Sequence, residues 1–202
     1  MNMTELFDLQ QTRRTIYALG KNVSMSEAEL SELIFNTIKE TPTAFNAQGS
    51  RAIILFGKAN ETLWNDITAT ALKPLTPAEN FPSTQAKLAS FAAGVGTILF
   101  FEDQDVVKNL QENVPLYAEN FPTWSEQASG MAQYATWLAL AEKNVGASLQ
   151  HYNPVIDEAV TAKWNIPSNW KLRAQMPFGS IENPADAKDY NTDASRFQTY
   201  TN

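Results

Sequence analysis

The spacing of apolar and polar residues predicts one long helix at the centre of the chain. From 128 to 145 the apolar residues recur at helical spacing, with one stripe formed by Ala128, Met131, Ala135 and Leu138 and widened by Ala132, Ala139 and Leu140. Polar residues end this segment before the ~20 apolar residues that a membrane span needs. We therefore expect a buried helix, and its small residues suit a dimer core or an ordinary intramolecular core about equally.

The remaining segments mix further helices with short apolar strands. The pattern predicts helices over 4–14, 27–40, 64–72, 81–92, 106–111 and 157–164, and strands over 52–56, 94–101, 147–150 and 171–177. Ser24 or Ser26 can cap the second helix. A loop bracketed by Pro115 and Pro122 carries aromatic residues that can cover a ligand, namely Tyr117, Phe121 and Trp124. This order of elements indicates an α+β or α/β three-layer fold.

The length and composition indicate one globular domain over residues 1–202. Hydrophobic residues make up 44% of the chain and no tract is of low complexity, so disorder throughout is excluded. The polar segment 180–202 has little means of folding alone and is expected to be a tail. The N-terminal sequence has no apolar core of a secretory signal, so we expect a cytoplasmic protein without a membrane anchor.

Charge and residue counts exclude several classes of function. The formal net charge is −7, and no stretch gathers enough Lys and Arg to neutralise a nucleic-acid backbone. The chain has no cysteine, and His151 is its only histidine. Thiolate metal sites and cysteine nucleophiles are therefore excluded, and a zinc site or a Ser-His-Asp triad is disfavoured. We expect no metal and no catalytic dyad or triad.

Two short segments carry groups that suit a nucleotide-like ligand. Arg13, Arg14 and Thr15 place two permanent cations and a hydroxyl together, which suits a phosphate, although arginines also favour a solvated helix end without a ligand. Residues 42–48 gather hydroxyl and carboxamide groups that can bind the edge of a planar heterocycle. The alternative is that Asn46 and Gln48 only satisfy the backbone of a turn.

Five motifs in order resemble the nitroreductase family. They are RRTIYALG (13–20), TPTAFNAQGSR (41–51), FAAGVGTILFFED (91–103), LQHYNP (149–154) and MPFG (176–179). The resemblance runs from about residue 10 to the end, and is closest to the short-chain branch of copper-induced and fatty-acid-repression-type nitroreductases. It implies an α+β, three-layer fold with a central, mostly antiparallel sheet flanked by helices. It also implies a homodimer that holds two FMN molecules at the subunit interface, with the tail packed on the dimer.

The resemblance assigns cofactor roles to particular residues. Arg13 and Thr15 correspond to phosphate ligands, with Arg14 lining the cofactor and Tyr17 near the flavin ring. A second subunit is expected to contribute its segment 42–48, through Pro42, Thr43, Asn46 and Gln48. Lys87 corresponds to a polar contact to the isoalloxazine, and the strand end whose backbone reaches flavin N5 corresponds to Gln150, His151 and Tyr152. In the tail, Arg196 is the first choice for closing over the phosphate and Lys188 the second.

The function that the resemblance implies is an FMN-dependent NAD(P)H oxidoreductase. NADH or NADPH would reduce the flavin, and a nitroaromatic or a quinone would then reoxidise it by a ping-pong mechanism. The flavin carries the chemistry, so no protein group is expected to be catalytic, and His151 is a candidate for the pocket wall. Many nitroreductases have a glutamate and a glycine at this strand end. His151 and Tyr152 depart from that pattern, and we expect this departure to affect the substrate pocket more than the cofactor site. The alternative is a non-enzymatic flavin-binding dimer that serves sensing or storage.

Overall fold

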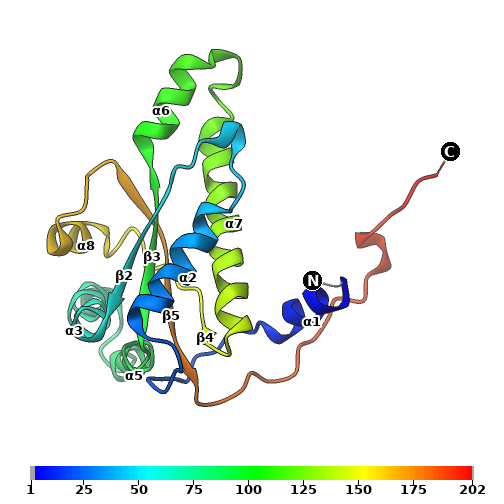
Figure 1. Cartoon of the computed structure of the whole chain (residues 1–202). Helices are drawn as coiled ribbons and strands as arrows, with labels where there is room; N and C mark the ends of the chain where they lie inside the picture. Colours follow the sequence, from blue (N-terminus) through cyan, green and yellow to red (C-terminus); the bar gives the residue numbers. More distant parts are fainter. Residues whose placement is uncertain (1–2, 202) are drawn as a thin grey trace.

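A computed structural model describes residues 3–201, in which one sheet lies between two layers of helices (Figure 1). Within this range the sheet has five strands. Four follow the order β1-β5-β3-β2, and β4 pairs with β5 outside this order. Each named pair is antiparallel, and one isolated bridge, between Thr15 and Ala147, is parallel. The strands are β1 (Leu19–Gly20), β2 (Ser50–Phe56), β3 (Gly96–Asp103), β4 (Gly146–Ala147) and β5 (Trp170–Ile181). The predicted α+β fold with a mostly antiparallel sheet is confirmed.

Strand β3 is the centre of the sheet, and every one of its residues is buried. Ile98 and Phe100 belong to the core on one face, and Leu99 and Phe101 to the core on the other. A strand covered on both faces reads as a continuous apolar run, which is how the sequence predicted it. Its observed bounds lie two residues later than the predicted 94–101.

The two helical layers cover opposite faces of this sheet (Figure 1). Helices α2 (Glu27–Lys39) and α7 (Phe121–Glu142) pack on one face. The other face is covered by α3 (Gly57–Glu61), η2 (Thr62–Thr68), α4 (Ala69–Leu72), α5 (Phe81–Ala92) and α8 (Asp157–Trp164). The exposed turn η3 (Lys73–Leu75) follows α4. The predictions for α5 and α8 agree in both bounds. Ser26 caps α2 through a capping box with Glu29, as the sequence allowed.

Helix α7 is longer and less buried than predicted. It begins at Phe121 instead of Ala128, because Pro122 lies in the first turn, where its missing N–H has no helical partner to lose. The prediction that Met131 is buried is wrong for this single chain, because 42% of its surface is exposed. The buried stripe instead follows every fourth residue, at Ala128, Ala132, Thr136 and Leu140. These mostly small residues allow α7 to lie close to α2 and the sheet.

The expected aromatic loop before α7 is mostly helical. Helix α6 (Gln104–Asn113) leads through η4 (Pro115–Tyr117) into α7, and the two helices extend beyond the end of the sheet (Figure 1). Phe121 and Trp124 therefore lie in the first turns of α7, and the prediction of a loop up to Pro122 is wrong. The helix predicted over 106–111 is α6, with two more residues at each end.

Several short predictions differ from the structure at their ends. The helix predicted over 64–72 is the middle of a helical run from Gly57 to Leu75, in which η2 is a π-helical segment. The strand predicted over 147–150 is reduced to β4 and an isolated bridge between Gln150 and Gln175. Strand β5 continues to Ile181, because its end pairs with β1. A side chain at Gly179 would overlap the carbonyl oxygen of Gly20 there.

Both ends of the described chain extend away from the sheet. Helix α1 (Met3–Thr12) and the tail after β5 leave the same side of the molecule near the C-terminal half of α7 (Figure 1). The tail has one short helical turn, η5 (Ala194–Arg196), and nearly all of its residues are exposed. The ends of the predicted domain and tail, residues 1, 2 and 202, lie outside the described range. Among residues 3–201, no helix combines the length and apolar character that crossing a lipid bilayer requires.

Candidate functional site

Arg13, Arg14 and Thr15 follow α1 directly and lie beside the C-terminal half of α7. The backbone is fixed here because the Ile16 N–H donates to the Ala147 carbonyl at 2.9 Å. The Arg13 guanidinium lies 4.4 Å from the ring centre of Trp137, a cation–π contact that holds its plane. Its Nε is buried and has no hydrogen-bond partner among the described residues. A buried, unpaired donor on a fixed guanidinium suits an anionic ligand.

Three cations meet in an open pocket of about 540 Å³ at this place. Arg13 and Arg14 line it together with Lys188 from the tail, and the other lining residues come from α1, α7 and the tail, namely Phe7, Gln10, Gln11, Tyr134 and Tyr190. Within residues 3–201, none of the three cations forms a salt bridge. Three unneutralised cations around a cavity favour a dianion such as a phosphate monoester. These residues therefore fit the phosphate of FMN.

The two candidate cations of the tail lie in different environments. Lys188 lines the pocket of Arg13 and Arg14, with its ammonium 4.9 Å from the ring of Tyr190. Arg196 is exposed in η5, where its guanidinium lies 5.1 Å from the ring of Phe197 and outside the pocket. In one chain, the second choice for the phosphate is therefore the residue that lies beside Arg13.

The segment from Pro42 to Gln48 has an unusual backbone. Phe45, Asn46 and Gln48 have φ angles of 54°, 52° and 50°, a left-handed region that costs non-glycine residues free energy. The turn is held by Thr43, whose hydroxyl accepts from the Gln48 N–H at 3.0 Å, and by Arg51, which donates to the Gln48 carbonyl at 2.7 Å. Strained backbone that its surroundings fix in this way is common at binding sites.

Asn46 and Gln48 are both exposed, and their side-chain amides make no hydrogen bond within the described part of the chain. The alternative that they only satisfy turn backbone is therefore wrong, because Thr43 performs that role. Pro42 is also exposed. Phe45 packs instead on an aromatic cluster, with ring centres 5.9 Å from Tyr117, 5.4 Å from Phe121 and 6.2 Å from Trp124. The free carboxamides remain available to a ligand.

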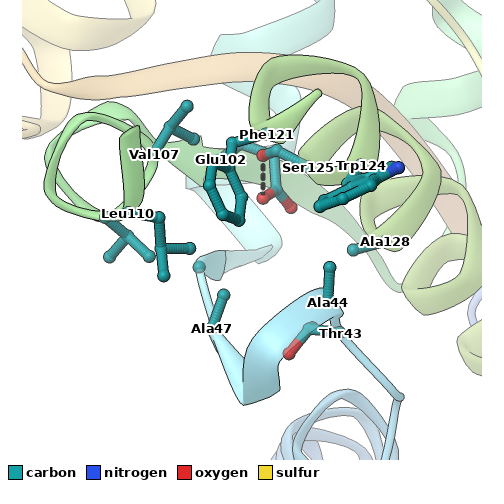
Figure 2. Close-up of a pocket in the computed structure, with 12 residues that line it drawn as sticks. Thr43, Ala44, Ala47, Glu102, Val107, Leu110, Phe121, Trp124, Ser125 and Ala128 are labelled. Carbon is teal, nitrogen blue, oxygen red and sulfur yellow. Dashed lines mark hydrogen bonds between the residues drawn. The ribbon is translucent and has the colours of Figure 1, made fainter. Parts of the chain in front are cut away.

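A small cavity lies beneath this segment, between α6 and α7 (Figure 2). It offers about 20 Å³, which is room for about one water molecule. Glu102 of β3 faces it and accepts hydrogen bonds from the hydroxyls of Ser50 at 2.5 Å and Ser125 at 2.7 Å. Burial raises the pKa of the Glu102 carboxyl above its ordinary value, while the two serine hydroxyls oppose this rise. Glu102 was not predicted from the sequence, although a carboxylate near the end of a buried strand is a readable signal.

The strand end after β4 lies at a third place. Gln150 is buried, His151 is exposed, and the ring of Tyr152 packs edge-on against Trp64 with ring centres 5.7 Å apart. Burial raises the pKa of the Tyr152 phenol. The backbone of this segment is paired with Gln175 of β5, a residue that the sequence analysis also missed.

Lys87 and Tyr17, two residues predicted to contact the cofactor, do not line the basic pocket in one chain. Lys87 is exposed on α5, in the helical layer across the sheet from α7, with its ammonium 6.0 Å from the ring centre of Phe91. Tyr17 is also exposed, on the segment between Thr15 and β1.

The two parts of the predicted cofactor site lie near opposite ends of α7. Arg13 contacts Trp137, whereas Phe45 of the segment 42–48 contacts Trp124. These tryptophans are 13 positions apart on the helix, which corresponds to about 20 Å along its axis. One chain therefore does not bring Arg13 and Asn46 around one small ligand.

Comparisons with known proteins place the chain in a family. Residues 11–180 match the model of the nitroreductase family. The protein HBN1 of Saccharomyces cerevisiae is 36% identical over 181 residues, which cover 88% of this chain and 89% of that protein. The nitroreductase CinD of Lactococcus lactis in complex with 4-nitrophenol is 52% identical with a TM-score of 0.88, covering 97% of this chain and 100% of that chain. With nicotinic acid bound, the same protein gives a TM-score of 0.91 at equal identity and coverage.

Proposed function

This chain belongs to the nitroreductase family, and we propose that it is an FMN-dependent NAD(P)H oxidoreductase that reduces nitroaromatics or quinones. The observation that carries the proposal is the pocket of Arg13, Arg14 and Lys188. Its three cations form no salt bridge with any residue from 3 to 201, and in that range the buried Nε of Arg13 has no hydrogen-bond partner, so the pocket fits the phosphate of FMN. The relative CinD binds 4-nitrophenol, which supports a nitroaromatic acceptor. When bound, FMN would supply the redox chemistry, accepting a hydride from NAD(P)H in one half-reaction and giving two electrons to the acceptor in the other, as in a ping-pong mechanism.

In this proposal the first motif anchors the cofactor phosphate. Arg13 offers a planar guanidinium that Trp137 holds in place, so little side-chain entropy is lost when it binds an anion. Arg14 and Lys188, which line the same pocket, add positive charge. The Thr15 hydroxyl would add a further contact to the phosphate, and Tyr17 would lie near the flavin ring. Arg196 remains an alternative to Lys188 if the tail takes another path on a partner.

A second copy of the chain completes the site in this proposal. The part that holds Arg13 and the part that holds Asn46 are about 20 Å apart along α7. If the α7 helices of two chains packed antiparallel, the Arg13 part of one chain would lie beside the Asn46 part of the other. Large apolar side chains on α1, α7 and the tail are exposed in the single chain, including Phe7 at 58%, Met131 at 42% and Phe197 at 78%. A partner that covers these surfaces would stabilise a homodimer. Pro42, Thr43, Asn46 and Gln48 then contact the partner's cofactor.

The strand end after Gln150 presents backbone to the flavin in this proposal, and no side chain acts as an obligatory acid. His151 is exposed and forms part of the pocket wall. Lys87, a cation of the other helical layer, would stabilise the negative charge that reduced flavin carries near N1 and O2.

Absorbance and turnover test the proposed function directly. The purified protein, incubated with FMN and dialysed, is expected to keep flavin bands and to oxidise NADH or NADPH when 4-nitrophenol or a benzoquinone is present. Double-reciprocal plots at several acceptor concentrations should be parallel, as a ping-pong mechanism requires. Flavin bands without turnover would favour a non-enzymatic flavin-binding dimer. A colourless protein that does not retain FMN would refute the proposal.

A further inference from the structure

Gln175 is a polar residue at an apolar position of β5. Its neighbours Ala174 and Met176 belong to the core on the α2–α7 face, so alternation places its side chain on the opposite face. Leu99, the residue paired with it on β3, belongs to the core of that face. Gln175 has no exposed surface. A carboxamide in these surroundings costs free energy unless its oxygen and nitrogen are hydrogen-bonded, so its partners indicate its role.

All of the partners of Gln175 outside the sheet lie on the segment from Gln150 to Asn153. Its backbone exchanges two hydrogen bonds with Gln150, at 2.7 and 2.9 Å. Its side-chain oxygen accepts from the Tyr152 N–H at 2.8 Å, and its side-chain nitrogen donates to the Asn153 side-chain oxygen at 3.4 Å. One buried residue therefore holds the chain immediately before and immediately after His151.

His151 itself has no such support. It is exposed, and neither its N–H nor its carbonyl forms a hydrogen bond within residues 3–201. Its two neighbours are fixed, and Tyr152 is fixed a second time by its ring, which packs edge-on against Trp64. Trp64 is in turn held by its Nε1, which donates to the Thr97 hydroxyl at 2.8 Å. The result is a backbone amide that is free of protein partners but held in one position.

We propose that Gln175 is a positioning residue that fixes the His151 backbone against the flavin of bound FMN. This inference rests on the proposed function, in which the strand end after Gln150 faces the cofactor. Gln175 is buried beneath that segment, and it acts through the Tyr152 N–H and the Asn153 side chain. Hydride transfer depends steeply on the relative placement of donor and acceptor, so looser backbone at His151 would slow it more than it weakens binding.

Gln175→Met tests the inference, because methionine keeps the length and flexibility of the side chain but cannot make either hydrogen bond. In FMN-free protein, hydrogen exchange of the Tyr152 amide should accelerate by about tenfold or more. In FMN-loaded protein, stopped-flow reduction by NADH should slow by about 10–100-fold. The Kd for FMN should change by less than about threefold, since the phosphate anchors the cofactor elsewhere.

Gln133→Met is the matched control, because it makes the same substitution at another buried glutamine. Gln133 lies in α7, in the other helical layer, and its side-chain nitrogen donates to the Ser129 hydroxyl at 2.9 Å. This variant should lose stability without faster Tyr152 exchange and without slower flavin reduction. A purely structural role of Gln175 predicts that both variants behave alike.

Four results would overturn the inference. Unchanged Tyr152 exchange in folded Gln175→Met protein contradicts it, and so does unchanged flavin reduction in that variant. If that variant does not fold, the wild type decides, because its Tyr152 amide should exchange about tenfold more slowly than that of His151, and equal rates contradict the proposed contact. A wild type that does not bind FMN refutes the proposed function and the flavin role with it, and the exchange data then still test whether Gln175 holds the segment.

Discussion

Replacing Glu102 by glutamine should change how the stability of this protein depends on pH. Only 2% of Glu102 is exposed, and its carboxylate accepts from Ser50 and Ser125. Burial raises its pKa above the ordinary value of 4.5, and the nearby charge of Glu126 adds to this, while the two serines and Arg51 lower it. The folded state therefore binds this proton more tightly than the unfolded state. The stability that it contributes is present below pH 4.5 and is lost as pH rises through the folded pKa.

The structure sets the size of the effects at low pH. Glutamine keeps both methylenes, accepts from one serine and donates to the other, so Glu102→Gln should lie within about 1 kcal/mol of the wild type below pH 4.5. Glu102→Ala removes two hydrogen bonds worth about 1 kcal/mol each and one buried methylene worth about 0.8 kcal/mol. Its expected cost is therefore about 3 kcal/mol.

Urea unfolding from pH 4 to 8.5 at one fixed protomer concentration measures these differences. The free energy of unfolding of Glu102→Gln should rise relative to the wild type as pH increases, and the difference should become constant above the folded pKa. Exposed Glu119→Gln is the control and should stay within about 0.5 kcal/mol of the wild type at every pH. A difference that is flat with pH, or in which the wild type gains, would refute the reasoning.

Further predictions concern the cofactor, the substrate pocket and the assembly. Arg13→Ala should weaken FMN binding by about 1.5–3 kcal/mol, or roughly 10–150-fold, through loss of a charge-assisted contact, as fluorescence titration would measure. Lys188→Ala should weaken FMN binding more than Arg196→Ala, since only Lys188 lines the basic pocket, and the reverse order would return the phosphate to Arg196. His151→Ala should retain FMN and most of its reduction by NAD(P)H but change acceptor preference. A selective loss of about 10²–10⁴-fold in the oxidative half-reaction would instead identify a general acid. Light scattering should find a homodimer, and a stable FMN-loaded monomer would contradict the shared site.

The order and type of most elements could be predicted from the sequence. Strand β3 reads as an unbroken apolar run, and α5 and α8 were placed with both bounds correct. These features are local, because burial on one or two faces leaves a periodic pattern within a few residues. The five motifs also determined the family, which residues 11–180 confirm. The predicted start of α7 is too late, because the prediction assigns Pro122 to a loop, although proline is tolerated in the first turn of a helix.

The grouping of side chains into sites was decided only by the tertiary structure. Glu102 meets Ser50 across 52 residues of sequence, and Gln175 meets Tyr152 across 23. Such contacts depend on strand pairing and register, which local periodicity does not specify. The family resemblance ranks Arg196 above Lys188, whereas the path of the tail in one chain places Lys188 in the pocket of Arg13. The sequence by itself determined which residue types the site contains, and the tertiary structure determined the distances between them.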